Sequence, residues 1–400
     1  MRELHAILEA IQESQRAGQT AILATVVQVE GSAYRKPGAR MLLTEDGWRA
    51  GSVSGGCLES DLLERAWPLT ASGDPVLVTY DTTEESDGIL GVGVGCRGVV
   101  QVLIERLAPG RAPDPIGFLR ECLQGRQAGA QATVFSRDGA VKTRIGARLL
   151  LHADGRVIAD IEDAELAARV EPDARRVLED GRSGVRLYAL RAGSVAVFIE
   201  AVQPPLPLLV CGAGHDARPM VRLAKELGWH VSVIDARPAY ATRGRFPEAD
   251  EVVLCPPEAI PMRVRLDRET VAVVMTHNYL QDQRLLEVLL SSPVRYLGIL
   301  GPRSRTRRLL SDLRAQGLAC TEAELERLFA PVGLDIGADG PEEIALAVLA
   351  EIRAVLAGRS GGSLRRRAGT IHGVEGAEPA TPGSNDTLRG VGAACARSAW

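Results

Sequence analysis

A glycine-rich turn constrains the fold of this chain more than any other feature. It follows an apolar run at residues 208–211 and opens a segment with helical spacing. Gly212, Gly214 and the small Ala217 fill the three positions of the pattern that joins the first strand and helix of dinucleotide-binding folds. Asp235 ends the next apolar run, where such folds place a carboxylate against a ribose hydroxyl. The spacing therefore predicts a Rossmann-like sheet with a nucleotide site at this turn.

The surrounding sequence favours a doubly wound parallel sheet of the α/β class. Helical patterns separate most of five apolar runs of strand length, at residues 208–211, 231–235, 251–254, 270–276 and 296–300. Such alternation is typical of a parallel sheet with crossover helices. A last helix is predicted from Pro341, because proline suits a first helical turn. The alternative is an inherited scaffold whose glycines serve only the tight turn.

The N-terminal part of the chain has a different pattern. Residues 1–107 predict an α+β domain, with a helix at 2–17, a helix after Cys57, and strands at 20–29, 40–44, 48–53, 75–80 and 98–107. We interpret residues 108–203 as an intermediate α+β segment or an extension of the first domain's sheet. A proline-rich linker leads into the Rossmann-like domain, residues 207–357. The Gly-, Ser- and Arg-rich residues 358–400 predict a disordered tail.

Composition narrows the class of protein. Seven cysteines are scattered without a Cys-x-x-Cys pair, which argues against a zinc ribbon and a disulfide framework. The net charge of −4 gives no sign of nucleic-acid binding through bulk charge. No apolar run is long enough for a membrane span, and the N-terminus has no signal-peptide pattern. We expect a cytoplasmic protein with reduced thiols.

One cysteine has a distinctive setting. Cys57 follows Ser54, Gly55 and Gly56 at the predicted start of a helix, where backbone N–H groups favour an anion or a thiolate. Thiolates bind soft metals and take part in sulfur chemistry. Cys57 is therefore a candidate catalytic residue with a reactive thiol. The alternative is a buried, inert thiol.

Several further motifs occur in a fixed order. In the first domain they are Gly31-Ser32-x-x-Arg35-x-x-Gly38-x-x-Met41 and Gly51-x-x-Ser54-Gly55-Gly56-Cys57-x-Glu59. In the second domain they include Cys211-Gly212-Ala213-Gly214-His215, Asp235-Ala236-Arg237, Arg245-Phe246-Pro247, Thr276-His277-Asn278, Tyr296-Leu297-Gly298 and Gly301-Pro302-Arg303. With these motifs the chain resembles the XdhC/CoxI family, accessory proteins of molybdenum hydroxylases such as xanthine dehydrogenase.

The resemblance implies a molybdenum-cofactor chaperone rather than a turnover enzyme. Family members are thought to bind molybdopterin-type cofactor, with or without a nucleotide, protect it, and help deliver its sulfurated form to an apo-hydroxylase. The resemblance also implies that Cys57 contacts the metal, and that Ser54, Gly55 and Gly56 contact the cofactor. The implied partners are a hydroxylase of the xanthine dehydrogenase or carbon monoxide dehydrogenase type and a cysteine desulfurase, with a homodimer as one possible state. Copper- or molybdenum-site maturation for carbon monoxide dehydrogenase is an alternative.

One segment departs from the family pattern. Gly95-Cys96-Arg97-Gly98 replaces a run that is often Gly-Cys-Gly-Gly-like, and Arg97 puts a bulky cation at its third position. Cys96 is either a second cofactor contact that faces Cys57 or a small residue in a tight turn. Both interpretations stay open.

Other candidate cofactor contacts are polar groups near the glycines. Arg35 and Arg40 flank a glycine-containing loop earlier in the first domain, and a planar guanidinium would suit a phosphate or a pterin. His277, with Asp282 nearby, follows the fourth strand of the second domain, where α/β crevices bind ligands, and is an acid–base candidate. Further candidates for an anionic group in that domain are His215, Arg237, Gly301 and Arg303. The alternatives are solvated charges, helix caps and a histidine satisfied by a backbone carbonyl.

Two rival functions remain open. An NAD(P)-dependent oxidoreductase would be supported by the Rossmann signature alone, with Asp235 on the ribose and His277 or Cys57 in catalysis. A scaffold that docks a sulfurtransferase and the hydroxylase, without touching the cofactor, would need none of these residues.

Overall fold

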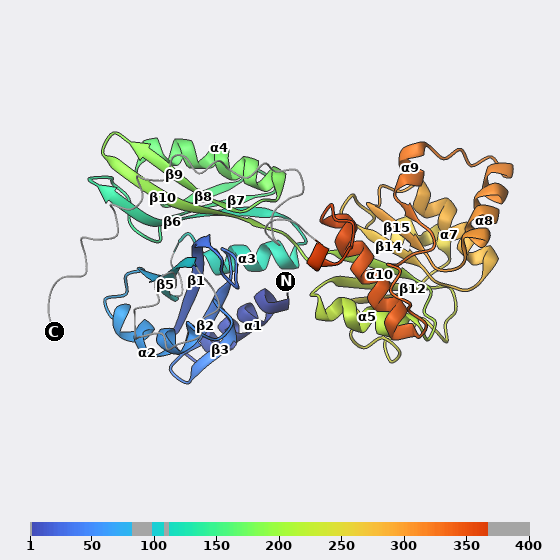
Figure 1. Cartoon of the computed structure of the whole chain (residues 1–400), viewed down its shortest axis with the longest axis horizontal. Helices are drawn as coiled ribbons and strands as arrows, with labels where there is room; N and C mark the ends of the chain where they lie inside the picture. Colours follow the sequence, from blue (N-terminus) through green and yellow to red (C-terminus); the bar gives the residue numbers. More distant parts are fainter. Residues whose placement is uncertain (1, 82–97, 108–111, 367–400) are drawn as a thin grey trace. The chain divides into compact units, whose positions relative to one another are not determined.

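The computed structural model describes residues 2–81, 98–107 and 112–366, and the chain forms two compact units, Met1–Pro205 and Leu206–Trp400 (Figure 1). We call them the N-terminal and the C-terminal unit. Cys96 and residues 367–400 of the expected tail lie outside the described residues. In the described part of the chain, no helix is long and apolar enough to cross a membrane.

The first half of the N-terminal unit is a five-stranded antiparallel sheet with the strand order β3-β2-β1-β5-β4. The β-branched, apolar run of residues 20–29 forms its central strand, as its composition predicts. Its elements are α1 (Arg2–Arg16), β1 (Ala21–Gly31), β2 (Arg40–Thr44), β3 (Gly47–Gly51), α2 (Glu59–Leu69), β4 (Val76–Asp81) and β5 (Gly98–Leu107).

The second half of this unit repeats the first. Its sheet has the order β8-β7-β6-β10-β9, which matches the first sheet strand for strand. The sequence Gly-Ala-Arg-Met-Leu-Leu at 38–43 corresponds to Gly-Ala-Arg-Leu-Leu-Leu at 146–151. We call the halves the first repeat (α1 to β5) and the second repeat (α3 to β10). The second consists of α3 (Pro115–Gln124), β6 (Gly129–Gly139), β7 (Arg148–His152), β8 (Val157–Ala159), α4 (Ala164–Asp180), β9 (Gly184–Leu190) and β10 (Gly193–Val202).

The two repeats pack through the inner faces of their sheets. Successive side chains of a strand point to opposite faces. Val26 of β1 accordingly shares a buried cluster with Leu62 of α2, whereas Val27 shares one with Phe135 and Phe198 of the second repeat. Figure 1 shows α2 and α4 on the outer sides of the two sheets. Burial of each such large apolar side chain contributes about 1.5–3 kcal/mol.

The C-terminal unit is the predicted doubly wound sheet. All its strands are parallel, in the order β13-β12-β11-β14-β15-β16. The strands are β11 (Pro207–Cys211), β12 (His230–Asp235), β13 (Glu251–Leu254), β14 (Val271–Val274), β15 (Tyr296–Ile299) and β16 (Leu328–Phe329). This order is that of the Rossmann fold, so the predicted fold class is confirmed.

Helices cover both faces of this sheet. One buried cluster joins the sheet to α5 (Ala217–Glu226) and α10 (Pro341–Leu356), and another joins it to α7 (Tyr279–Leu290) and α8 (Arg303–Ala315). Helix α10 begins at the proline that the sequence predicts. The short helices are η1 (Pro257–Ala259), α6 (Ile260–Arg263), α9 (Glu322–Glu326) and η2 (Leu364–Arg366).

Candidate functional site

The turn between β11 and α5 lies where the strand order of the sheet reverses, the usual ligand position in such folds. Gly212 has a φ of 117°, and a Cβ there would lie 2.7 Å from the carbonyl oxygen of Met275 at the end of β14. Its N–H donates to the carbonyl of Ile234 at 2.8 Å. Ala217 is fully buried at the first turn of α5. The turn thus has the close backbone approach that the glycine pattern predicts.

Asp235 lies at the end of β12, and its carboxylate already accepts hydrogen bonds from other groups of the protein. Its oxygens accept from the N–H of Ala213 at 2.8 Å and from Nε and Nη2 of Arg237 at 2.9 and 2.7 Å. Burial alone raises the pKa of Asp235, but the hydrogen bonds from Arg237 and Ala213 lower it below the ordinary value. The guanidinium of Arg237 also lies 3.7 Å from the ring centroid of Tyr240. A ribose would have to compete with Arg237 for this carboxylate.

His277 pairs with Asp216, not with Asp282. His277 Nε2 and Asp216 Oδ2 lie 2.6 Å apart, so the pair links the end of β14 to the start of α5. His277 has a φ of 58°, a strained conformation for a residue with a side chain. Asp216 places a carboxylate at the helix start where a pyrophosphate would bind, which disfavours a second anion there. The position of Asp216 inside the glycine pattern could have identified this residue from the sequence.

Asp282 serves a different contact. It is buried and accepts from Arg305 of α8 and from the hydroxyl of Thr276. Near it, Gly301 has a φ of 124° after β15, and Arg303 is exposed at the first residue of α8. All the candidates of this unit therefore follow the carboxyl ends of β11, β12, β14 or β15.

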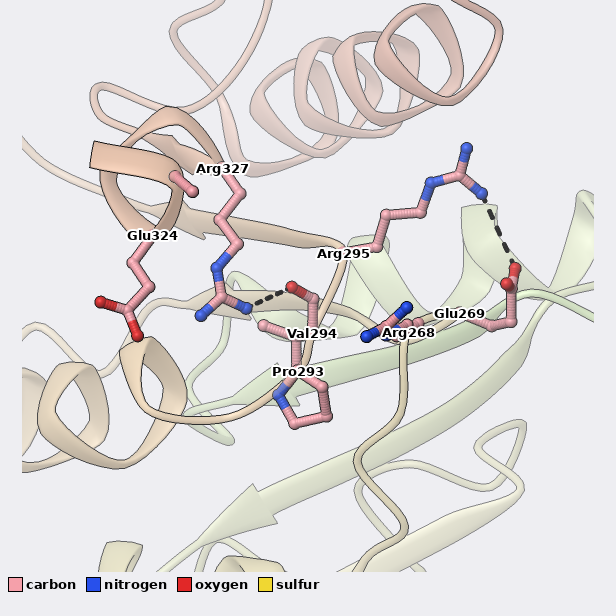
Figure 2. Close-up of a pocket in the computed structure, with 8 residues that line it drawn as sticks. Arg268, Glu269, Pro293, Val294, Arg295, Glu324 and Arg327 are labelled. Carbon is pink, nitrogen blue, oxygen red and sulfur yellow. Dashed lines mark hydrogen bonds and ion pairs between the residues drawn. The ribbon is translucent and has the colours of Figure 1, made fainter. Parts of the chain in front are cut away.

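A surface hollow of about 520 Å³ lies at the opposite, amino edge of the same sheet (Figure 2). Arg327 donates to the carbonyl of Val294, and Arg295 pairs with Glu269 at 3.7 Å. These contacts tie together the segments that lead into β14, β15 and β16. We assign no ligand to this hollow because it lies away from the edge where α/β sheets bind ligands.

In the first repeat, the loop before Cys57 is held by its own side chains. The carboxylate of Glu59 accepts from the N–H groups of Val53 and Ser54 at 3.1 and 2.8 Å and from the Ser54 hydroxyl. The Ser54 oxygen accepts in turn from the N–H groups of Gly56 and Leu58, both at 3.1 Å. These four N–H groups therefore serve the loop itself rather than an external anion.

Glu59 gives this loop a pH dependence. Burial alone raises the pKa of Glu59, but the hydrogen bonds from the Ser54 hydroxyl and from the N–H groups of Ser54 and Val53 lower it below the usual value. A carboxyl with a lowered pKa adds stability that is fully present above its unfolded pKa and is lost as the pH falls through its folded pKa.

We expect Glu59→Gln to destabilise the N-terminal unit by about 2 kcal/mol at neutral pH, the scale of hydrogen bonds to a charged group. The difference from the wild type should shrink as the pH falls below the ordinary glutamate pKa of 4.5 and through the lowered pKa of Glu59. Urea unfolding across this range measures it. Glu64→Gln, an exposed position on the same helix, is the control and should change stability by less than about 0.5 kcal/mol. A difference that persists unchanged at low pH would contradict this account of Glu59.

Cys57 lies partly exposed against the cluster under α2. Gly55 lies against the ring of Tyr34, whose nearest atom would be in ordinary contact, at 3.5 Å, with a Cβ at this position. Arg35 fastens the preceding loop to α1, since its Nη2 donates to both carboxylate oxygens of Glu3 at 2.7 and 2.8 Å. Within the described ranges, no three His, Cys, Asp or Glu side chains meet as a metal site. Cys57 is thus a single thiol on a fixed loop.

Arg40 lies on the other face of this sheet from α2 and is 5% exposed. It makes two hydrogen bonds to Glu200 of the second repeat, one of them from Nη1 to Oε1 at 2.9 Å. Arg148, which corresponds to Arg40, pairs with Glu105, which corresponds to Glu200. Arg40 therefore belongs to a pair of crossed contacts between the repeats, and it does not share a site with Cys57.

The crossed pairs border a cavity of about 380 Å³ between the repeats, which we call the inter-repeat cavity. Sequence reasoning missed Glu105, Arg148 and Glu200. A comparison of the chain with itself could have found them, because each repeat carries the Gly-Ala-Arg segment and a Glu near the end of its last strand.

Fold and site together define a two-unit α/β protein in which a Rossmann-type unit follows a duplicated, thiol-bearing α+β unit. Residues 208–352 match the family model described as the XdhC Rossmann domain. Residues 14–81 and again 122–189 match the model of the XdhC and CoxI family. The chain belongs to the XdhC and CoxI family, as its motifs predict. The second model matches once on each repeat, which supports the duplication.

Individual relatives agree with this assignment. The chain is 36% identical over 355 residues to a probable xanthine dehydrogenase subunit of Bacillus subtilis, covering 88% of this chain and 97% of the relative. It is 23% identical to the molybdenum cofactor insertion chaperone PaoD of Escherichia coli over 87% of each chain. The crystal structure of a xanthine dehydrogenase from Bacillus halodurans matches with a TM-score of 0.71 and 28% identity, over 89% of this chain and 98% of that one.

Proposed function

We propose that this protein binds the molybdenum cofactor, protects its sulfurated form and inserts it into a molybdenum hydroxylase of the xanthine dehydrogenase type. The observation that carries the proposal is the Cys57 thiol, partly exposed on a loop that Ser54 and Glu59 hold in place. The similarity to PaoD, named as an insertion chaperone for this cofactor, supports the same role.

A lone thiol fits this cofactor better than a bare metal ion. A protein site for a bare ion needs several ligands, and the described residues offer no such cluster. The molybdenum of the cofactor arrives already chelated by its own dithiolene sulfurs, so a single soft thiolate is enough to contact it. The thiols of Cys122 and Cys211 are buried, and burial raises the pKa of Cys122 to about 11. Neither would supply a thiolate at neutral pH.

The test is transfer of sulfurated cofactor to a cofactor-free hydroxylase under strict anaerobiosis. We expect Cys57→Ala to lower the recovered hydroxylase activity at least tenfold, because the sulfur contact is lost. Cys320→Ala, at the other partly exposed cysteine among the described residues, should leave activation within about twofold of wild type. Full activation by Cys57→Ala would remove this residue from the proposal and favour a scaffold role.

An NAD(P)-dependent oxidoreductase is the second candidate, because the turn at Gly212 keeps the dinucleotide geometry. Two contacts weigh against it: Arg237 already binds Asp235, and Asp216 puts a negative charge at the start of α5. Titration with NADH and NADPH, followed by nicotinamide fluorescence, separates the candidates. We expect no saturable change up to about 1 mM, the upper end of ordinary KM values.

The client and the sulfur source can be varied in the same transfer assay. We propose a hydroxylase of the xanthine dehydrogenase type as client and a cysteine desulfurase as sulfur donor, in the cytoplasm. When the assay starts from cofactor that lacks the sulfur ligand, omission of the desulfurase should leave transferred cofactor without restored activity. Copper in the purified protein, together with activation of a carbon monoxide dehydrogenase, would favour the alternative client.

A further inference from the structure

The two repeats correspond position by position, so each surface residue of one has an equivalent in the other. Glycines with a positive φ recur in step: Gly31, Gly38, Gly47 and Gly73 correspond to Gly139, Gly146, Gly155 and Gly181. The buried residues under the outer helices do the same: Leu58, Leu62 and Ala66 correspond to Leu166, Val170 and Ala174. Every pair has the same separation in the sequence, so the alignment of this part of the repeats needs no gap.

Three exposed apolar side chains of the first repeat have charged equivalents in the second. Tyr34, Trp48 and Leu63 are 69%, 52% and 36% exposed. The equivalent residues are Lys142, Arg156 and Glu171. Because the second repeat forms the same sheet and the same outer helix with these charged residues, the fold does not require apolar side chains here. Another molecule is the remaining reason for them.

Both aromatic rings contact the loop that carries Cys57. Trp48 Nε1 donates to the carbonyl of Gly51, where this loop begins, at 2.7 Å. The ring of Tyr34 lies against Gly55 of the same loop. The two rings thus lie along one loop, near the thiol.

Leu63 and Trp48 lie on the same side of the sheet as Cys57. Trp48 pairs in register with Leu43, and residues opposite each other share a face. Leu43 and Cys57 belong to the cluster under α2. Leu63 Cδ2 lies 4.0 Å from the Cβ position of Gly47, the residue before Trp48. The three apolar side chains therefore flank a partly exposed thiol, and we call them together the thiol-side surface (Tyr34, Trp48, Cys57 and Leu63).

The charges around this surface do not favour an anionic partner. Three neighbouring arginines are each paired with a carboxylate: Arg35 with Glu3, Arg49 with Glu13 and Arg65 with Asp61. The other charged neighbours in sequence are Lys36, Glu45, Asp46 and Glu64. A nucleic acid or an acidic membrane would therefore meet paired arginines and an excess of acid. A protein surface fits better, since protein interfaces are rich in Tyr and Trp and poor in Lys and Glu.

The thiol distinguishes between possible protein partners. A protein that covers the thiol-side surface also covers Cys57. A stable pair of identical copies would close off the thiol of each copy. A protein that takes over a group held by Cys57 must come within contact distance of this thiol, and the thiol-side surface is where it can do so.

We propose that the thiol-side surface docks the hydroxylase that receives the cofactor, through an apolar protein surface that packs on Tyr34, Trp48 and Leu63. The choice of the hydroxylase rests on the proposed function, whereas the docking surface follows from the comparison of the repeats. Docking at this place would bring the acceptor to Cys57 and exclude water from the transfer.

The test uses the purified, cofactor-free hydroxylase of the transfer assay and calorimetric titration. The triple variant Tyr34→Lys/Trp48→Arg/Leu63→Glu carries the residues of the second repeat, so it should keep the urea midpoint of the wild type. We expect it to bind the hydroxylase at least about thirtyfold more weakly, and Trp48→Arg alone about tenfold, on the scale of central interface residues. Leu187→Thr is the control, because it exchanges an exposed leucine of the second repeat for its equivalent, Thr79, and should stay within about twofold of the wild type.

Cofactor content separates this inference from the proposed function. We expect the triple variant to retain as much molybdenum and pterin as the wild type, whereas Cys57→Ala should lose cofactor and keep hydroxylase binding within about threefold. If the wild type does not bind the hydroxylase, or the triple variant binds it equally well, the docking surface is wrong and the proposed function still stands on its cofactor content. Loss of cofactor from the triple variant would assign the rings to the cofactor instead. A wild-type dimer that the triple variant converts to a monomer would assign the surface to a second copy.

Discussion

Gly212→Ala is expected to destabilise the C-terminal unit by about 3 kcal/mol or more. The left-handed φ of 117° costs a side-chain-bearing residue about 1–2 kcal/mol. The new methyl group would also lie 2.7 Å from a backbone oxygen of Met275, and such overpacking costs typically about 1–3 kcal/mol. The neighbouring atoms belong to the backbone, so no side-chain rotation relieves the contact.

Hydrogen exchange measures this effect for each unit separately. Amides of β11, β12 and β14 should lose protection, while those of the N-terminal unit keep it. Gly244→Ala is the control in the same unit, because no atom lies within 4 Å of its Cβ position, and it should change stability by less than about 0.5 kcal/mol. Equal stability of the two variants would show that the turn tolerates a side chain, against the geometry of its backbone.

Arg40→Met is expected to destabilise the N-terminal unit by about 3–5 kcal/mol, because it leaves the Glu200 carboxylate buried without its partner. Burial alone lowers the pKa of Arg40, but the nearby carboxylate of Glu200 raises it above its ordinary value, so the pair is ionised in the folded state. The double variant Arg40→Met/Glu200→Leu should recover most of the loss, since apolar pairs often replace buried ion pairs at little cost.

The duplication adds a second expectation to this experiment. Arg148→Met should cost about as much as Arg40→Met, because Arg148 makes the equivalent contact with Glu105. Arg65→Met removes an exposed partner of Asp61 and serves as the control, with an expected change of less than about 1 kcal/mol. Urea unfolding, read by hydrogen exchange in the N-terminal unit, gives all four values. A large cost for one arginine and none for the other would contradict the symmetric account of the crossed pairs.

Local sequence patterns predict the fold of the C-terminal unit well. The turn at Gly212 and the run of alternating strands and helices predict the parallel sheet, because a tight turn, a close backbone approach and a buried strand each need particular residue types in sequence. Helix α10 begins at Pro341 for the same kind of reason.

The candidate site was only partly accessible to sequence reasoning. Arg40 and Cys57 lie close in sequence, but strand alternation puts Arg40 on the inner face of its sheet, whereas Cys57 packs with the α2 side. The partners of Arg40 and His277 lie far away in the sequence, at Glu200 and Asp216, and the motifs around Arg40 and His277 do not indicate these contacts. The second repeat was not detected from the sequence because its equivalent of the Cys57 loop lacks the glycine and cysteine motif. Its strands nevertheless keep the Gly-Ala-Arg segment.

The central claim is that this protein holds the molybdenum cofactor. The most direct measurement is elemental analysis of the full-length protein, purified anaerobically from cells that make the cofactor, together with fluorescence of the released pterin. We expect molybdenum and pterin in equal amounts, both reduced in Cys57→Ala and unchanged in Cys320→Ala. Protein that contains neither molybdenum nor pterin under these conditions would contradict it.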